Sequence, residues 1–387
     1  MGCREKKNGS ATGNRLQAVA NPIMKLRPPC LPFLAASFFL LLHSVRSETK
    51  SRQIKRAVEE KVGQAKLPGM VAAITSSKGV MAIGSAGVRK DGSEVKLAED
   101  DLVHLGSCTK AMTSVLLGTL VDEGKITWET SLIAILPELK GKIHPDHQAV
   151  TVWQLLTHRS GVEANAANWW IHRKMELKAR RLAILEENLK EAPARKQGAY
   201  HYSNLGYLIA GCMAEKITGS TWESLMQKRI FDPLDMKSAG FGPPGSPGKT
   251  DQPWGHVRSD EGWRPRQFDN AQSLGPAGRV HCAVSDWAKF LAIQLPGGNK
   301  LGLNPKTLDQ LITPYGNYAG GWNVTKRPWG KGTVLTHSGS NTMWYALAWV
   351  APEIDRAFLV VTNSRDEHSH PTCDQMIGKL IGINLGK

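Results

Sequence analysis

Strand-forming segments lie at both ends of this 387-residue chain, and helix-forming segments fill its middle. Apolar, β-branched runs at 70–75 and 80–88 flank the turn Ser76-Ser77-Lys78-Gly79, a pattern typical of a hairpin. Similar runs return near the C-terminus, at 334–337, 343–350 and 357–362. Isolated hairpins are marginal in water, so the two ends are expected to share one sheet. The pattern predicts an α/β (α+β) fold, in which helices flank an antiparallel sheet built from both termini and a mainly helical subdomain is inserted.

Helical periodicity and turn residues divide the chain further. The stretch 236–270 is rich in Gly and Pro and is expected to be loop. Apolar residues at helical spacing predict helices at 54–62, 109–123, 151–158, 171–191, 203–217, 221–230, 285–295 and 371–381. We therefore expect one catalytic domain over 48–387, with 48–125 and 285–387 as the sheet part and 126–284 as the mainly helical part.

The first 47 residues have the pattern of a secretory signal peptide. Basic residues precede the apolar run Phe33–Leu42, and Val45 and Ser47 supply small residues for a cleavage site. Ten apolar residues fall short of the roughly 17 that span a bilayer, so an uncleaved anchor is the weaker alternative. We expect a periplasmic or secreted protein without stable membrane insertion once residues 1–47 are removed. Met24 is an alternative start.

The formal net charge of +15 suggests nucleic acid or another polyanion as a partner. Residues 1–47 hold seven basic side chains and one acid, so they account for +6 of this charge. The remaining +9 is dispersed, and the densest basic run, 173–181, includes Glu176. No nucleic-acid partner is therefore expected.

Four cysteines follow the leader, and none belongs to a CxxC pair or to a His–Cys spacing suited to zinc. Small buried thiols are favoured, with one or two disulfides as the alternative in an oxidising compartment. No metal or cofactor is expected. The four residues are Cys108, Cys212, Cys282 and Cys373.

One of four Ser-x-x-Lys patterns, Ser107/Lys110, lies where a loop enters a long apolar helix. Residues three apart on a helix are about 60° apart in projection, so the amine can reach the hydroxyl. The helix N-terminus also favours an anion that develops at Ser107. The neighbouring Cys108 points about 100° away from that face and is interpreted as a packing residue.

A lysine acts as a base only when it is neutral, so burial and further polar groups should face Lys110. Tyr202-Ser-Asn204 begins a predicted helix and supplies a phenol and a carboxamide. The second Tyr-x-Asn, Tyr315-Gly-Asn317, lies in a Gly-rich turn and is taken as structural. The cluster Thr336–Ser340 ends a strand, and there the Ser340 N–H can pair with the Ser107 N–H as an oxyanion hole.

The order Ser-x-x-Lys, Tyr-x-Asn, His-Ser-Gly, with gaps of 95 and 135 residues, resembles the serine β-lactamase and penicillin-binding-protein superfamily. The Tyr-x-Asn element is similar to that of class C β-lactamases and their carboxylesterase and peptidase relatives. The resemblance covers about 54–383. The stretches 155–161, 275–286 and 320–324 look like framework segments of that family.

The resemblance implies a role for each motif residue. Ser107 would be the acylated nucleophile, Lys110 its proton acceptor, Tyr202 the general base and acid, and Asn204 a ligand for the substrate amide. His337-Ser338-Gly339 would replace the family's usual Lys-Thr-Gly and, with Ser340, bind substrate.

The histidine in that motif affects the expected substrate. His337 offers a positive charge only when it is protonated, near or below a pKa of about 6.5. This favours the esterase and peptidase-like branch over strong β-lactamase activity. We expect a secreted serine hydrolase that forms an acyl-enzyme on small ester or amide substrates. The alternatives are a β-lactamase or cell-wall D-peptidase, and a non-catalytic binder of cell-wall peptide. The sequence leaves the oligomeric state open.

Overall fold

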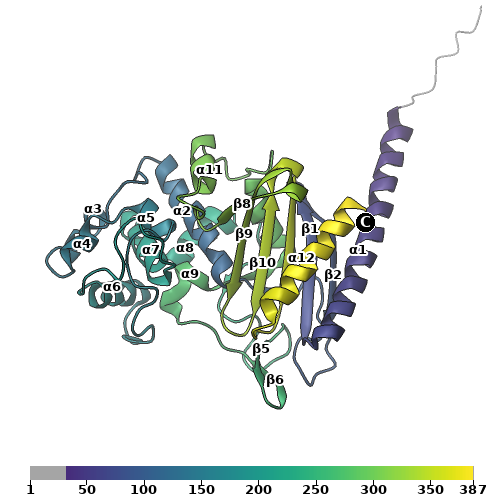
Figure 1. Cartoon of the computed structure of the whole chain (residues 1–387), viewed down its shortest axis with the longest axis horizontal. Coiled ribbons are helices and arrows are strands. Elements are labelled where there is room, and N and C mark those ends of the chain that lie inside the picture. The colour runs from purple at the N-terminus through teal and green to yellow at the C-terminus, as the bar shows by residue number, and fades with distance from the viewer. Residues whose placement is uncertain (1–31, 387) are drawn as a thin grey trace, which may run out of the picture. The chain divides into compact units, whose positions relative to one another are not determined.

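The computed structural model describes residues 32–386, and residues from Val45 onward form one compact unit. Its centre is a six-stranded antiparallel sheet in the order β2-β1-β11-β10-β9-β8 (Figure 1). The strands are β1 (Gly69–Ser76), β2 (Gly79–Gly87), β8 (Asn323–Arg327), β9 (Gly332–Ser340), β10 (Tyr345–Ala351) and β11 (Arg356–Thr362). The predicted fold is confirmed, and β8 is a strand that sequence reasoning missed.

The two ends of the compact unit meet at the β1–β11 pair. Met70 lies opposite Thr362 and Thr75 lies opposite Ala357, so the hairpin near the N-terminus extends the C-terminal strands. The sheet therefore cannot form until residues almost 300 positions apart have met.

The sheet buries both of its faces, because its side chains alternate between two cores. On one face Met70 and Phe358 pack against α1 (Pro32–Ala65) and α12 (Ser369–Leu385). On the other face Val71 and Leu359 join the larger core, which includes α2 (Thr109–Asp122). Figure 1 shows α12 lying along the strands on the face away from α2. Layers on both sides explain why β1 is buried throughout its length instead of in alternate positions.

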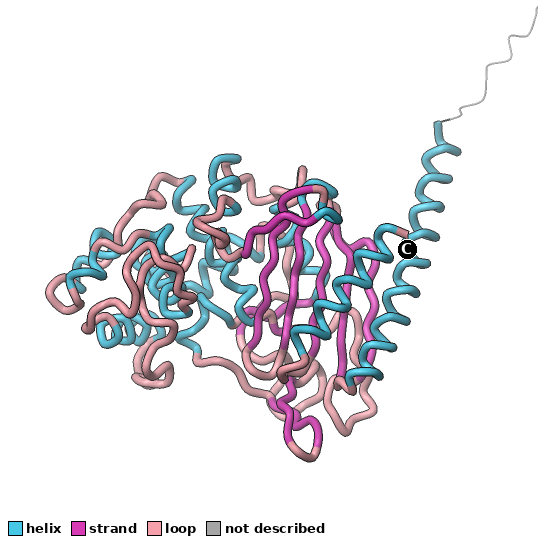
Figure 2. Tube along the Cα trace, viewed as in Figure 1, coloured by secondary structure: helices cyan, strands magenta, loops and turns pink. Residues whose placement is uncertain are grey.

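Residues 126–284 are mostly helix and loop, as Figure 2 shows, but two predictions for this part need correction. The helix predicted at 171–191 is only α6 (Leu177–Asn188), because 169–175 forms turns. The predicted loop at 236–270 contains β4 (Gly240–Phe241) and the hairpin of β5 (Gly255–Ser259) and β6 (Gly262–Arg266). The hairpin was not predicted because Pro265 lies within β6, and proline within a strand is typical only of edge strands.

The remaining helices surround the larger core or close the chain. They are α3 (Leu132–Ile135), α4 (Pro145–Gln148), α5 (Val152–Leu156), α7 (Asn204–Thr218), α8 (Trp222–Met226), α9 (Gly275–Gly278), α10 (Val284–Leu291) and α11 (Pro305–Ile312). Two short strands, β3 (Leu102–His104) and β7 (Val280–Ala283), form a second sheet with β4.

Most of the predicted leader, residues 1–31, lies outside the described residues, and α1 continues through the predicted cleavage position. Within residues 32–386 no helix combines the length and the apolar character that crossing a bilayer requires. All four cysteines after the leader are buried and unpaired, which confirms them as small buried thiols.

Candidate active site

A tight turn between β3 and α2 presents Ser107. The turn is one 3-10 helical turn, Gly106–Cys108, that continues directly into α2. Gly106 has φ +50°, and a Cβ there would lie 2.2 Å from the Ser340 backbone nitrogen, so only glycine fits. Ser107 is half-buried, whereas Cys108 is buried and burial raises the pKa of its thiol. This geometry agrees with the interpretation of Ser107 as the candidate nucleophile and of Cys108 as a packing residue.

The Lys110 amine is fully buried and contacts three oxygens. Its Nζ lies 2.7 Å from Asn204 Oδ1, 2.8 Å from the Ala277 carbonyl oxygen and 3.1 Å from Ser107 Oγ. Burial lowers the pKa of Lys110 to about 7. A neutral amine has two N–H donors and one lone pair. Asn204 and Ala277 can only accept from it, so the lone pair remains for the Ser107 hydroxyl.

Tyr202 and Asn204 lie on either side of Ser203, the residue that caps α7. The Tyr202 phenol lies near enough to Ser107 for that hydroxyl to act on its pKa, and its ring centroid is 4.8 Å from Lys110 Nζ. Burial raises the pKa of Tyr202, so the phenol is neutral. Asn204 donates through Nδ2 to Asn165 Oδ1 at 2.8 Å. The structure therefore brings the four predicted residues of the two motifs into one cluster, with Tyr202 in its proton-donating form.

Strand β9 contributes its backbone to the site. A Cβ on Gly339 would lie 2.6 Å from the Ser107 nitrogen and 2.0 Å from the Leu105 carbonyl oxygen, so the strand rests directly on the nucleophile turn. The Ser340 nitrogen lies against Gly106 in the same contact. This close approach supports the predicted pairing of the Ser107 and Ser340 N–H groups.

The structure places the His337 and Ser338 side chains on opposite faces of β9. His337 is buried, and burial with the nearby Lys110 lowers its pKa to about 3. Its Nδ1 donates to the Ser338 carbonyl at 2.6 Å, and its Nε2 accepts from the Tyr318 hydroxyl at 2.8 Å. Ser338 points to the opposite face of β9, where its hydroxyl interacts with Tyr345. His337 is therefore neutral and buried on the Tyr318 side of β9, and Ser338 faces the other side of the strand.

Sequence reasoning missed a buried chain of polar contacts beneath the nucleophile turn. His104 Nδ1 accepts from the Gly106 N–H at 3.1 Å, and its Nε2 lies 3.0 Å from Asp269 Oδ1. The same carboxylate accepts from Asn341 Nδ2 at 2.9 Å and from Arg279 Nε at 3.1 Å. Asp269 thus ties the turn that carries Ser107 to the residue next to Ser340.

The pKa of Asp269 supports an ionised carboxylate in that chain. Burial acts to raise this pKa, but His104, Arg279 and Asn341 together hold it below its usual value. The segment around Asp269 gave no recognisable pattern in the sequence, because its three partners come from three other parts of the chain.

His158 was also missed, although its segment, 155–161, resembles a framework stretch. It is fully buried, with φ +59°, and its ring centroid lies 4.3 Å from that of Tyr202 and 4.6 Å from that of Tyr318. Its Nδ1 accepts from the Ser203 N–H at 3.0 Å. Burial and the nearby Lys110 hold the pKa of His158 well below its usual value, so it supports Tyr202 as a neutral ring.

No group of three His, Cys, Asp or Glu side chains arranged to hold a metal ion occurs among residues 32–386.

A family model described as Beta-lactamase matches residues 54–379. The chain is 24% identical over 373 residues to the unguisins hydrolase ungD of Aspergillus violaceofuscus, covering 86% of this chain and 64% of the relative. It is 30% identical over 163 residues to the lovastatin esterase of Penicillium rubens, covering 37% of this chain and 40% of the relative. It therefore spans less than two thirds of either relative.

Solved structures share the fold at low sequence identity. The D-amino acid amidase from Ochrobactrum anthropi SV3, solved with L-phenylalanine amide, has a TM-score of 0.71 at 18% identity. The match covers 87% of this chain and 99% of that one.

Proposed function

The chain belongs to the beta-lactamase family, and from that premise we propose that it is a serine hydrolase that forms an acyl-enzyme on Ser107. The observation that carries the proposal is the environment of Lys110. The Lys110 amine has a pKa near 7, and two acceptors engage its protons, so that its lone pair is left for Ser107 Oγ. Such an amine can remove the serine proton.

Acylation then follows from the contacts. As Ser107 Oγ attacks the substrate carbonyl carbon, its proton moves to Lys110 Nζ, and the carbonyl oxygen becomes an oxyanion beside the Ser107 and Ser340 N–H groups. The neutral Tyr202 phenol gives its proton to the leaving group as the bond to the acyl carbon breaks. The lysine ammonium returns a proton to Tyr202. A water molecule then attacks the acyl carbon and gives a proton to Lys110 by way of Tyr202, and the lysine ammonium returns a proton to Ser107 Oγ as its bond to the acyl carbon breaks.

We propose small esters or amides as the substrates. The neutral, buried His337 supports this choice over β-lactams, because the strand offers no fixed positive charge for a drug carboxylate. The names of the two relatives, a hydrolase and an esterase, are consistent with it. We further propose that residues 1–47 direct export and are removed, which the N-terminal mass of the mature protein tests.

The direct test is hydrolysis of p-nitrophenyl butyrate by the wild type and by Ser107→Ala. We expect turnover by the wild type and a loss of about 10³-fold or more in the variant. Unchanged turnover in Ser107→Ala would contradict the assignment of Ser107 as the nucleophile. Nitrocefin separates the alternative activity, because hydrolysis of nitrocefin without ester hydrolysis would favour a β-lactamase.

The non-catalytic alternative has its own test. A binder of cell-wall peptide needs no activated nucleophile, whereas a serine hydrolase reacts covalently with a fluorophosphonate. Labelling of the wild type but not of Ser107→Ala is expected. A wild type that resists the probe would support the binder.

A further inference from the structure

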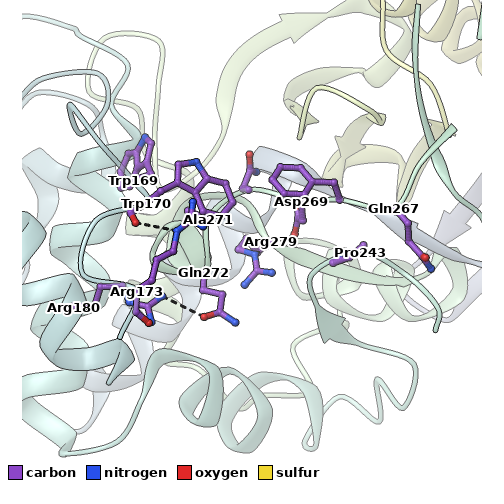
Figure 3. Close-up of a pocket in the computed structure, with 12 residues that line it drawn as sticks. Trp169, Trp170, Arg173, Arg180, Pro243, Gln267, Asp269, Ala271, Gln272 and Arg279 are labelled. Atoms are coloured by element: carbon purple, nitrogen blue, oxygen red, sulfur yellow. Dashed lines mark hydrogen bonds and ion pairs between the residues drawn. The ribbon is translucent and has the colours of Figure 1, made fainter. Parts of the chain in front are cut away.

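A pocket of about 350 Å³ lies between two loops of the compact unit (Figure 3). One wall comes from the segment 169–173 together with Arg180 at the start of α6. The other wall comes from the segment 267–272 and Arg279. The proposed proton transfers use none of these side chains, although Asp269 and Arg279 also belong to the buried polar chain beneath the nucleophile turn.

Both walls are connected to the catalytic cluster. Asn270 Nδ2 donates to the Gly278 carbonyl at 3.0 Å, and a Cβ on Gly278 would lie 3.5 Å from the Gly106 carbonyl carbon. On the other side, Asn165 belongs to the loop that continues into 169–173 and accepts from Asn204. Each wall is therefore linked to the catalytic cluster through an intervening residue, Gly278 on one side and Asn165 on the other.

Two aromatic rings at the pocket are left exposed. Trp170 and Phe268 stack with their centroids 5.5 Å apart and their planes at 27°, yet 39% and 57% of their surfaces face solvent. Exposed aromatic surface at a concave site is typical of a ligand-binding region. A flat ring from a ligand can stack against this pair.

The pocket also carries excess positive charge. It contains three arginines and one aspartate, and that aspartate, Asp269, is paired with Arg279. No carboxylate among the described residues lies within ion-pair distance of Arg173 or Arg180. Arg180 uses its N–H groups on Gln272 and on backbone carbonyls, so it is fixed in the wall. Arg173 lies over the Trp170 ring at 4.8 Å and is exposed.

We propose that this pocket binds the acyl part of the substrate, and that this acyl part combines an aromatic ring with a carboxylate. The ring would stack with Trp170 and Phe268, and the carboxylate would meet Arg173. Tyr202, which serves the leaving group, is surrounded by His158 and His337, and neither of them lines the pocket. The acyl assignment rests on the proposed function, whereas the ligand chemistry rests on the pocket alone.

A matched pair of esters tests the proposal. The 4-nitrophenyl esters of (4-carboxyphenyl)acetic acid and (4-methylphenyl)acetic acid have nearly the same shape and differ by one negative charge. We expect the wild type to prefer the carboxylate ester by about fivefold to tenfold in kcat/KM, because an exposed arginine pair is of modest strength. Arg173→Gln should reduce this ratio to about one. The ratio is unaffected by partial misfolding, since a loss of active protein cancels from it.

Two controls make the result specific. Lys326→Gln removes an equal charge from an exposed position in a different pocket and should leave the ratio unchanged. Added salt should lower the ratio in the wild type, because it screens exposed charges. A wild type that hydrolyses the two esters equally, or an Arg173→Gln variant that keeps the preference, overturns the proposal.

A binding measurement separates this proposal from the proposed function. Ser107→Ala protein is titrated with (4-carboxyphenyl)acetamide and (4-methylphenyl)acetamide while tryptophan fluorescence is followed. Tighter binding of the carboxylate compound, lost on Arg173→Gln, supports the pocket even if the chain hydrolyses no ester. Equal binding of the two compounds refutes it even if esters acylate Ser107 in the wild type.

Discussion

Two buried basic side chains flank the nucleophile turn, and they differ in what they can do. Lys110 belongs to the helical wall, which we define as Lys110, Asn204 and Tyr202, and burial brings its pKa to about 7. His337 belongs to the strand wall, defined as His337 and Tyr318, and its pKa lies at about 3. At neutral pH the first can exchange a proton with Ser107 and the second cannot.

Hydrogen bonding, in addition to burial, explains why Lys110 and His337 differ in their ability to accept a proton. The lysine lone pair is left for Ser107, whereas both ring nitrogens of His337 are already engaged, one with the Ser338 carbonyl and one with Tyr318. A basic residue near a nucleophile is therefore a proton acceptor only when its partners leave the lone pair free. The predictions below test this contrast.

Lys110→Met should have the largest effect. It removes the proton acceptor while keeping an unbranched side chain in the buried space, so kcat/KM for p-nitrophenyl butyrate should fall by about 10³-fold. The steady-state rate of p-nitrophenol release measures this. A loss below tenfold would show that another group deprotonates Ser107.

The pH dependence of acylation should follow Lys110. Its amine must be neutral to act, so kcat/KM should rise tenfold per pH unit below about pH 7 and level off above it. The initial rate of ester hydrolysis between pH 5 and 9 gives the profile. A plateau that extends unchanged to pH 5 would mean that Lys110 does not titrate in this step.

Asp269→Asn should have an intermediate effect. Asp269 touches no reacting atom, but through His104 and Asn341 it positions both amides of the oxyanion hole. We expect kcat for the butyrate ester to fall by about tenfold with little change in KM, since misplaced donors weaken transition-state binding. Active sites counted with a fluorophosphonate correct for any loss of folded protein. An unchanged kcat per active site would leave Asp269 a purely structural role.

His337→Gln should have the smallest effect. Glutamine keeps a hydrogen-bond acceptor for Tyr318, and the histidine is neutral throughout the assay range, so kcat/KM should stay within about threefold. The pH profile should keep its midpoint near 7. Loss of that midpoint would identify His337, and not Lys110, as the titrating group.

The parts of the site that lie close together in sequence were predictable. Ser107 and Lys110 are one helical turn apart, and Tyr202 and Asn204 flank one helix cap, so local spacing alone places each pair. The fold was predictable for a similar reason, because the strand segments are continuous apolar runs.

The other parts depend on contacts between distant segments. Asp269 reaches the site from a loop and Ala277 from the one-turn helix α9, neither of which shows periodicity, and only the folded chain brings them to Ser107 and Lys110. The neutral state of His337 follows from Tyr318 and from burial, which the motif itself does not reveal. Motif spacing thus indicates which residues meet, while their protonation depends on the surroundings.

The most direct test is a time course of intact mass followed by peptide mapping, with the wild type exposed to a fluorophosphonate at several pH values. We predict a single adduct on Ser107 that forms faster as the pH rises through about 7 and is absent from Ser107→Ala. An adduct on another residue, or a rate of formation that does not change between pH 5 and 9, would contradict activation of Ser107 by a neutral Lys110.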